Sequence, residues 1–448
     1  MSHISLSEHF TYPKIFKIVI GPVLMMIFSS FYSVVDGIFL SAYAGDGAFS
    51  GVNLIFPYIM ILGGVGFMLG KGGVALVTKT LGEGDKKKAN SYFSLVLYFA
   101  IALGVIITIV GYFTAEPFAR MMASLSSSNT DLMIDAAIRY GHTMVLGITL
   151  FMLQNIFQSF FSGAEKPLMG FVFIAGAGIL NILLDWLFVG VLSMGVEGAA
   201  YATIIGQFVG GVLPILYFSL YKKLPFKLGK CKLEIKPLLK IMGNGSSEFV
   251  SNIASSIVSV CYNMQLLRYI GPDGVSAYGV CMYMNYLFMA IFLGYSVGVA
   301  PIIGYNYGAQ NHDELHNVFK KSLIIIGIVG FCMLGLGEGV GPIFASVFAN
   351  GNEHLNQIAT KAMRIYSFVY LTAGFSIFGS AFFTGLNNGL ISAIISIVRA
   401  LIFELSMVWL LPIGMGGDGI WLASPLAEIA STIITVYFYI HEQKKYKY

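Results

Sequence analysis

Apolar runs of about 20 residues recur along the whole of this 448-residue chain, and short polar stretches separate them. Each run could cross roughly 30 Å of hydrocarbon as a helix. The short alternating segments of an outer-membrane barrel are absent. The pattern predicts twelve spans, near residues 15–40, 49–79, 91–114, 133–161, 168–190, 199–221, 240–269, 276–306, 318–337, 359–383, 389–411 and 419–440.

Composition agrees with this pattern. Hydrophobic residues make up 57% of the chain and charged residues only 11%, against roughly 25% charged in soluble domains. The chain is therefore predicted to be an all-α polytopic membrane protein. We expect no cleavable signal peptide, because the first apolar run is too long and no small-residue cleavage site follows it. The four cysteines lack CxxC or Cys/His metal spacing.

Basic residues indicate the orientation. The two ends of the chain and the loops on their side hold 19 of the 26 Lys and Arg residues, and the opposite side holds five. The positive-inside rule therefore places both termini in the cytoplasm. Because these basic residues are scattered along loops and form no single patch, the net charge of +4 does not indicate nucleic-acid binding.

The second half of the chain repeats the first, in the same order and with an offset that falls smoothly from 227 to 221 residues. The matching segments are AGDG (44–47) with GPDG (271–274), LGEGD (81–85) with YGAQN (307–311), FFSG (160–163) with FFTG (382–385), and EGAAYA (197–202) with DGIWLA (418–423). The repeat predicts an N-lobe, 1–222, a cytoplasmic linker, 223–232, and a C-lobe, 233–448. Six spans per lobe give two parallel repeats around a central cleft, which is a transporter architecture.

Two carboxylates lie inside predicted spans of the N-lobe. They are Asp36 in FYSVVDGIFL and Asp185 in NILLDWLF, and each costs on the order of 2.5–3.5 kcal/mol near a bilayer centre. Neither acid is kept in the C-lobe, where Asp36 corresponds to Asn263 and Asp185 falls near Ser406 or Met407. This asymmetry predicts a cation or proton site in the N-lobe and none in the C-lobe.

Asn181 adds an amide one helical turn from Asp185, on the same helix face. Two carboxylates and an amide can supply hard oxygen ligands for a small cation. Two close carboxylates can instead share a proton, because like charges disfavour double ionisation. Both possibilities fit ion-coupled transport, and the structural alternative is that helix-to-helix hydrogen bonds satisfy both acids.

Seven segments together resemble the multidrug and toxic compound extrusion (MATE) transporters. In chain order they are VDGIF, LGEGD, GAEKP, NILLD, MGVEGAAYAT, PIIGYNYGAQN and GDGIWLA. The resemblance covers nearly the whole chain. It implies a bacterial inner-membrane antiporter that expels small organic, often cationic, compounds against Na⁺ or H⁺ entry. It also implies a monomer that contacts membrane lipids and needs no cofactor besides the coupling ion.

Within that family, the resemblance places the chain in the branch whose cation site lies in the N-lobe. The matching positions are Asp36, Asn181, Asp185 and Thr203, which would hold Na⁺ if it is the coupling ion, together with Tyr140 and a possible cavity residue, Asn155. Another branch carries a C-lobe glutamate on the seventh helix. This chain has Ser256 there, and Glu248 lies about two turns earlier.

Several other polar residues fall inside spans. Lys71, between glycines in LGKGG, could face the cleft, pair with a carboxylate or extend toward one membrane face. Glu248 could contact substrate or could be a helix-end acid. Arg399 and Glu404 are better explained by contacts with neighbouring helices than by substrate. The remaining candidates for the cavity or for interhelical hydrogen bonds are Gln154, Gln158 and Asn263.

Three other functions remain open at this point. A flippase for lipid-linked saccharides shares the superfamily fold, but such proteins carry more spans and a cavity rich in Arg and Lys. A membrane enzyme is disfavoured because no HExxH, GxSxG or phosphate-binding loop occurs in the chain. A channel would need a charged ring around a continuous pore, which two asymmetric lobes do not suggest.

Overall fold

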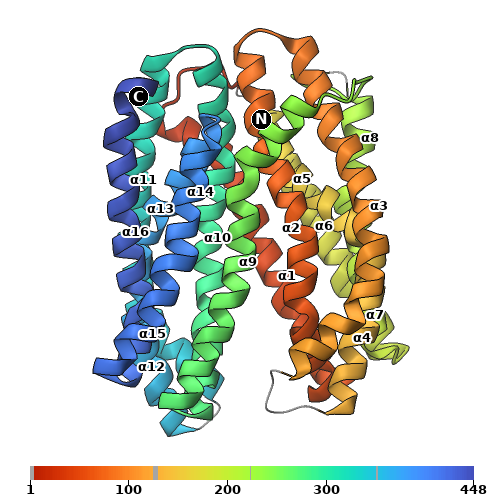
Figure 1. Ribbon diagram of the computed structural model, residues 1–448, viewed down its shortest axis with the longest axis vertical. Coiled ribbons are helices and arrows are strands. Elements are labelled where there is room, and N and C mark those ends of the chain that lie inside the picture. The colour runs from red at the N-terminus through yellow and green to blue at the C-terminus, as the bar shows by residue number, and fades with distance from the viewer. Residues whose placement is uncertain (1–4, 125–129, 222, 350–351) are drawn as a thin grey trace.

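The structure is a computed structural model that describes residues 5–124, 130–221, 223–349 and 352–448. These residues are mostly helical, and no strand occurs among them. Figure 1 shows two helical bundles side by side, one from each half of the chain, with both termini at the same end. We name that end the terminal end.

The first half forms the six segments of the N-lobe. They are α1 (Tyr12–Phe39), α2 (Asp46–Gly82), α3 (Lys86–Ser124), α4 (Asp131–Leu146) with α5 (Ile148–Gly163), α6 (Pro167–Asp185), and α7 (Gly195–Gly211) with α8 (Leu213–Leu220). Two π-helical turns, η1 (Leu40–Ala44) and η2 (Trp186–Val191), extend α1 and α6.

The second half forms the C-lobe with the same order of segments. They are α9 (Ile235–Tyr269), α10 (Pro272–Gly308), α11 (His312–Ala349), α12 (Glu353–Ser367) with α13 (Val369–Gly385), α14 (Gly389–Ile397) with η3 (Val398–Phe403) and α15 (Glu404–Met415), and α16 (Gly417–Tyr446).

Most of the predicted spans are long, apolar helices. Within the described residues, nine helices are long and apolar enough to cross a membrane, and two bent pairs raise the number to eleven. The remaining segment, α9, has 35 residues but a more polar sequence, MGNGSSEFVSN, in its first half. Its polar side chains line a cavity in the C-lobe, so this helix is less apolar than the other spans.

Two spans that the sequence pattern predicts as continuous are bent. The chain turns by 61° between α4 and α5 and by 47° between α12 and α13. At the first bend, a side chain on Gly147 would meet Ile204 of α7, so the glycine allows the two helices to approach closely. The bends recur at corresponding places in the two lobes, as the repeat requires.

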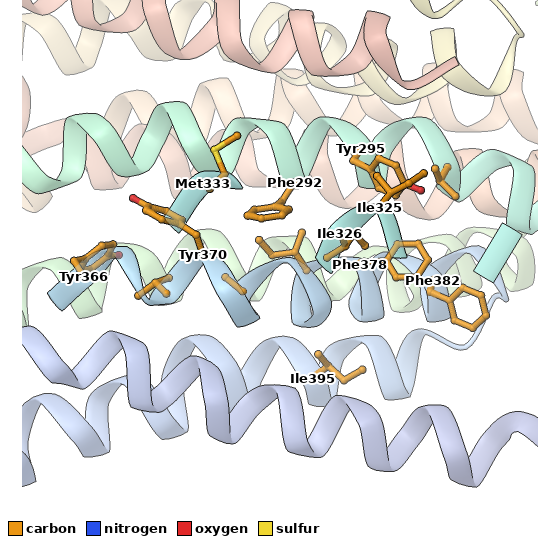
Figure 2. Close-up of a cluster of buried hydrophobic side chains, with 14 of the residues drawn as sticks. Phe292, Tyr295, Ile325, Ile326, Met333, Tyr366, Tyr370, Phe378, Phe382 and Ile395 are labelled. Carbon is orange, nitrogen blue, oxygen red and sulfur yellow. The ribbon is translucent and has the colours of Figure 1, made fainter. Parts of the chain in front are cut away.

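The core of the C-lobe is rich in aromatic residues. In Figure 2, Phe292 and Tyr295 of α10 lie alongside Tyr370 and Phe378 of α13, and all four side chains are buried. The rings of Tyr295 and Phe378 meet edge to face with centroids 6.2 Å apart. In lipid, helices associate through such close packing, because apolar burial alone gives little driving force between them.

The lobes contact each other near the terminal end. There α1 packs along α10, and α2 packs along α9 and α10. Side chains placed on Gly72 or Gly245 would overlap Ile241 O or Met68 O of the opposite helix. Figure 1 shows α2 and α9 diverging toward the other end. The structure is therefore closed at the terminal end.

A short segment before α1 also links the lobes at this end. Leu6 N donates to Glu165 of the N-lobe at 2.7 Å, and Phe10 N donates to Glu314 of the C-lobe at 2.8 Å. Lys321 of the C-lobe donates to Phe10 O at 2.7 Å. Leu6 and Phe10 are both buried in the C-lobe core. Separating the lobes at the terminal end would break this segment's contacts with at least one of them.

Candidate functional site

Two carboxyl groups face each other inside the N-lobe. Asp36, near the end of α1, and Asp185, the last residue of α6, lie within hydrogen-bonding reach of each other. Asp185 is fully buried and Asp36 is half-buried. In the described part of the chain, no other group donates a hydrogen bond to Asp36 Oδ1 or to either oxygen of Asp185. Buried acceptors without donors can bind a cation or retain a proton.

The backbone near both acids is irregular. The π-helical turn η1 begins four residues after Asp36, and η2 begins directly after Asp185. In the C-lobe, η3 contains Arg399 and ends directly before Glu404. Such turns often occur at functional sites, because they re-aim side chains and free backbone groups.

Asn181 and Thr203 lie beside the acidic pair. Asn181 is one turn before Asp185 on α6 and donates to Thr203 Oγ1 of α7 at a long 3.4 Å. Its own Oδ1 has no partner among the described residues. A side chain on Gly206 of α7 would lie 2.9 Å from Ala177 O and 3.3 Å from Asn181 Cβ, so glycine allows this close approach. The amide oxygen and the hydroxyl could join the two carboxylates around a small cation.

Two tyrosines line the same site. Tyr140 of α4 is buried, and it lies close enough to Asp36 and Asp185 to interact electrostatically with both carboxylates. Tyr32 lies one turn before Asp36 on α1. It interacts electrostatically with the Asp36 carboxylate and also contacts Gln154 of α5. A phenol hydroxyl can donate to a carboxylate or accept from a bound proton carrier.

A second layer of buried amides surrounds these groups. Gln154, Asn155 and Gln158 on α5 and Gln207 on α7 are all buried. Gln154 Oε1, Asn155 Nδ2 and Gln207 Oε1 have no hydrogen-bond partner within the described residues. Unpartnered amides of this kind are costly in an apolar interior unless a ligand or water pairs with them.

Lys71 and Glu248 form an ion pair between the lobes. Lys71 Nζ of α2 lies 2.5 Å from Glu248 Oε1 of α9, and their side chains are only 16% and 19% exposed. The pair lies beside the Gly72 and Gly245 contact between the same two helices. Lys71 therefore neutralises a C-lobe acid and does not serve as a charge partner of Asp36 and Asp185.

The C-lobe contains a cavity of about 330 Å³ that is lined by both charged and apolar side chains. Glu404 accepts from Tyr262 at 2.8 Å and from Ser424, and Arg399 pairs with Glu428 at 2.7 Å. All five of these residues except Tyr262 line the cavity. Among the described residues there is no group of three or more His, Cys, Asp and Glu side chains that could hold a metal ion.

Comparison with known proteins now identifies the family. The family model named MatE matches residues 22–187 and 249–410, which is most of the chain. The chain belongs to the MatE family.

Relatives and solved structures agree with this assignment. The multidrug export protein MepA of Staphylococcus aureus is 24% identical over 437 residues, which cover 95% of this chain and 94% of MepA. A multidrug resistance MATE transporter solved in an outward-facing conformation has the same fold, with a TM-score of 0.90, 21% identity and coverage of 97% and 96% of the two chains. A Pyrococcus furiosus transporter, described as having a binding pocket of reverse polarity, matches equally well.

This MatE protein is thus a multi-pass membrane transporter and not an enzyme. The match to solved MATE structures confirms the predicted fold of twelve helices in two six-helix lobes. The lobe boundaries and the roles of individual residues remain predictions.

The structure brings together the predicted N-lobe residues. Asp36, Asp185, Asn181, Thr203 and Tyr140 form one cluster. The predicted amides Gln154, Asn155 and Gln158 are buried on α5, where Gln154 reaches the cluster through Tyr32.

The absence of a cation or proton site from the C-lobe stays a prediction, although this lobe does hold acids inside its helices. Glu428 is buried there and Glu404 is half-buried, at positions that do not correspond to Asp36 or Asp185. Arg399 and Glu404 do contact neighbouring helices, as expected, but they also line the cavity. Asn263, the repeat equivalent of Asp36, is half-buried and is not among the described residues that line it.

Sequence reasoning missed Tyr32, Gln207 and Glu428. Gln207 and Glu428 correspond to each other in the repeat, 221 residues apart. Gln207 lies one turn after Thr203, and Glu428 lies one turn after Ser424. This shared pair at i and i+4 is a signal that could have identified both residues.

Proposed function

We propose that this MatE protein is an antiporter that exports small organic, often cationic, compounds in exchange for Na⁺ or H⁺. The observation that carries the proposal is the contact between Asp36 and Asp185, whose carboxyl groups face each other inside the N-lobe. Acids inside a membrane protein are costly and commonly belong to ion or proton pathways. The name of MepA, a multidrug export protein, supports the choice of cargo.

In this mechanism the two acids act as one binding unit. Asp36 and Asp185 take up one H⁺, or bind Na⁺ together with Asn181 and Thr203, and Tyr140 stabilises the charge that remains. The ion neutralises the pair, so the free energy of each lobe arrangement depends on whether the ion is bound. No cofactor beyond the coupling ion is required, and the protein works as a monomer among the lipids of the bacterial inner membrane.

The direction of access follows from the charge distribution. The positive-inside rule places the terminal end in the cytoplasm. The closed terminal end then corresponds to a state that faces the outside, and transport requires rocking of the lobes to open that end. Either the contact of Leu6 with Glu165 or that of Phe10 with Glu314 would break in each cycle.

The orientation gives a direct prediction. Ser219, at the end of α8, and Lys230, in the linker, are exposed at the terminal end. A cysteine introduced at either position should not react with an impermeant thiol reagent in intact cells, but should react after the membrane is permeabilised. Labelling from outside the intact cell would reverse the proposed topology.

The flippase alternative has less support. A cavity that binds a lipid-linked pyrophosphate needs free basic side chains. Two basic residues inside the predicted spans, Lys71 and Arg399, are each paired with a glutamate, Glu248 and Glu428. Neither is free to bind a phosphate in this arrangement.

Flux measurements test the proposed function. Purified protein in liposomes should move tetraphenylphosphonium against its concentration gradient when a Na⁺ or H⁺ gradient is imposed, and only down its gradient otherwise. Testing each ion separately identifies the coupling ion. Flux that is indifferent to both gradients would show that the protein is not an ion-coupled antiporter.

A further inference from the structure

Glu248 belongs to two structural features at once. Its carboxylate pairs with Lys71 of the N-lobe at 2.5 Å, and the same residue lines the C-lobe cavity of about 330 Å³. Lys71 itself is not among the described residues that line this cavity. One carboxylate therefore lies between a base of the opposite lobe and an internal space large enough for an organic molecule.

The cavity has the chemistry of a site for an organic cation. Its charged lining residues are Glu248, Glu404, Glu428 and Arg399. Arg399 pairs with one oxygen of Glu428, whereas Glu428 Oε2, on a residue only 5% exposed, has no partner in the described structure. The acids therefore exceed the bases.

The rest of the lining suits bulky apolar cargo. It includes Tyr278, Tyr286, Met282 and Met289. Aromatic faces attract cations, and methionine side chains adapt to ligands of different shapes. This combination favours a compound with a delocalised or quaternary positive charge and apolar substituents.

We propose that Glu248 binds the cationic centre of the exported compound when the lobes are apart at the terminal end, and that Lys71 displaces the compound when they close. This inference rests on the proposed function and adds a binding site and a release step to it. The site is the C-lobe cavity, and the ligand class is the lipophilic organic cation.

The two partners of Glu248 exclude each other. An ammonium group 2.5 Å from the Glu248 carboxylate occupies the position that a ligand cation would need. Lys71 is on α2 and Glu248 is on α9, so the ion pair forms only when the lobes meet. Because Gly72 and Gly245 adjoin the pair, close approach of these helices brings the two charges together.

This exclusion gives export a direction. When the terminal end is open, Glu248 is free and the cavity has high affinity for the cation. When that end closes, Lys71 acts as a tethered competitor, and the affinity falls just as the cavity faces the outside. A competitor present only in one state lowers ligand affinity in that state alone.

Equilibrium binding of radiolabelled tetraphenylphosphonium to purified, detergent-solubilised protein tests the inference without any ion gradient. Lys71→Met should bind the probe about tenfold more tightly than wild type, because the competitor is gone, whereas Lys71→Arg should resemble wild type. Adding Glu248→Gln to Lys71→Met should abolish the gain. Glu338→Gln is the matched control, since Glu338 of α11 pairs weakly with Arg364 at 4.0 Å, away from the cavity.

Exchanging the charges of Lys71 and Glu248 distinguishes cation binding by Glu248 from a purely structural role of the ion pair. Lys71→Met leaves a partly buried acid without its partner and could impair folding. The double variant Lys71→Glu with Glu248→Lys keeps an ion pair but places a base in the cavity. It should fold and lose at least about tenfold in affinity for the probe.

Two results would overturn the inference. One is a charge-exchanged protein that binds the probe as wild type does, and the other is a folded Lys71→Met variant with unchanged or weaker affinity. If wild type still exports the probe in liposomes, only the role of Glu248 and Lys71 is wrong. If wild type neither binds nor exports it, the proposed function fails as well.

Discussion

Replacing Asp36 with asparagine is expected to lower gradient-driven export by about a hundredfold or more, while the protein still inserts and folds. The substitution keeps the size of the side chain and removes a charge that costs on the order of 2.5–3.5 kcal/mol near a bilayer centre, so insertion should not suffer. Asp185 would then lack its acidic neighbour, and the pair could no longer exchange an ion. The C-lobe has Asn263 at the equivalent position of its first helix, which indicates that an amide is tolerated at this position of the repeat.

Asp185→Asn should have the same effect, measured as uphill flux per correctly folded molecule. If the two acids act as one unit, the double variant should be little worse than either single variant. Substrate binding should persist at least in part in all three proteins. An Asp36→Asn protein that expresses poorly but transports normally per molecule would show that Asp36 is structural.

Replacing Gly72 with valine is expected to hold the terminal end open and to stop the transport cycle. A side chain at Gly72 would overlap the backbone oxygen of Ile241, and backbone atoms of a packed helix move little. Overpacking costs about 1–3 kcal/mol or more, which shifts a two-state equilibrium by about fivefold to more than a hundredfold toward the arrangement without the clash. Gly245→Val, which would overlap Met68 O, should act in the same way.

Thiol accessibility at Ala75 measures this change. Ala75 is fully buried in the closed arrangement, and its backbone oxygen accepts from Asn387 of the C-lobe at 3.1 Å. In a background without the natural cysteines, Ala75→Cys should react readily in the Gly72→Val protein and slowly otherwise. Gly243→Val is the matched control, because a side chain on Gly243 meets no other atom within 4 Å. Equal reactivity of Ala75→Cys in all variants would show that Gly72 and Gly245 are not needed to close the terminal end.

The sequence predicted the N-lobe cluster well because its signals are local. An acid inside an apolar run has a clear energetic cost, and Asn181 and Asp185 share a helix face through their spacing alone. Tyr32 carries no comparable signal, because the chain has 25 tyrosines and nothing in the sequence around Tyr32 distinguishes it from the others. Glu428 did carry a signal, as a carboxylate inside the span predicted at 419–440, and it was overlooked.

Contacts between the lobes were harder to predict for a physical reason. A transporter sequence encodes at least two lobe arrangements of similar free energy. The pairing of Lys71 with Glu248 belongs to the arrangement that is closed at the terminal end. From the sequence, Lys71 could face the cleft, pair with a carboxylate or extend toward one membrane face. Only the packing of α2 against α9 shows which of these occurs.

The bends between α4 and α5 and between α12 and α13 were missed for a related reason. Neither site carries proline, and Gly147 lies in a run that is otherwise apolar and helical. The break at Gly147 accompanies its close approach to Ile204, a contact between helices that are distant in sequence. Apolar periodicity predicts where a span lies in the membrane and does not predict such tertiary contacts.

The central claim is that one ion held by Asp36 and Asp185 is exchanged for one organic cation. The most direct test is to add tetraphenylphosphonium to purified protein in weakly buffered solution and to measure the H⁺ and the Na⁺ released. Because binding linkage is reciprocal, wild type should release about one ion per protein, and both Asp36→Asn and Asp185→Asn should bind the probe and release none. Undiminished ion release from the double variant would contradict the account.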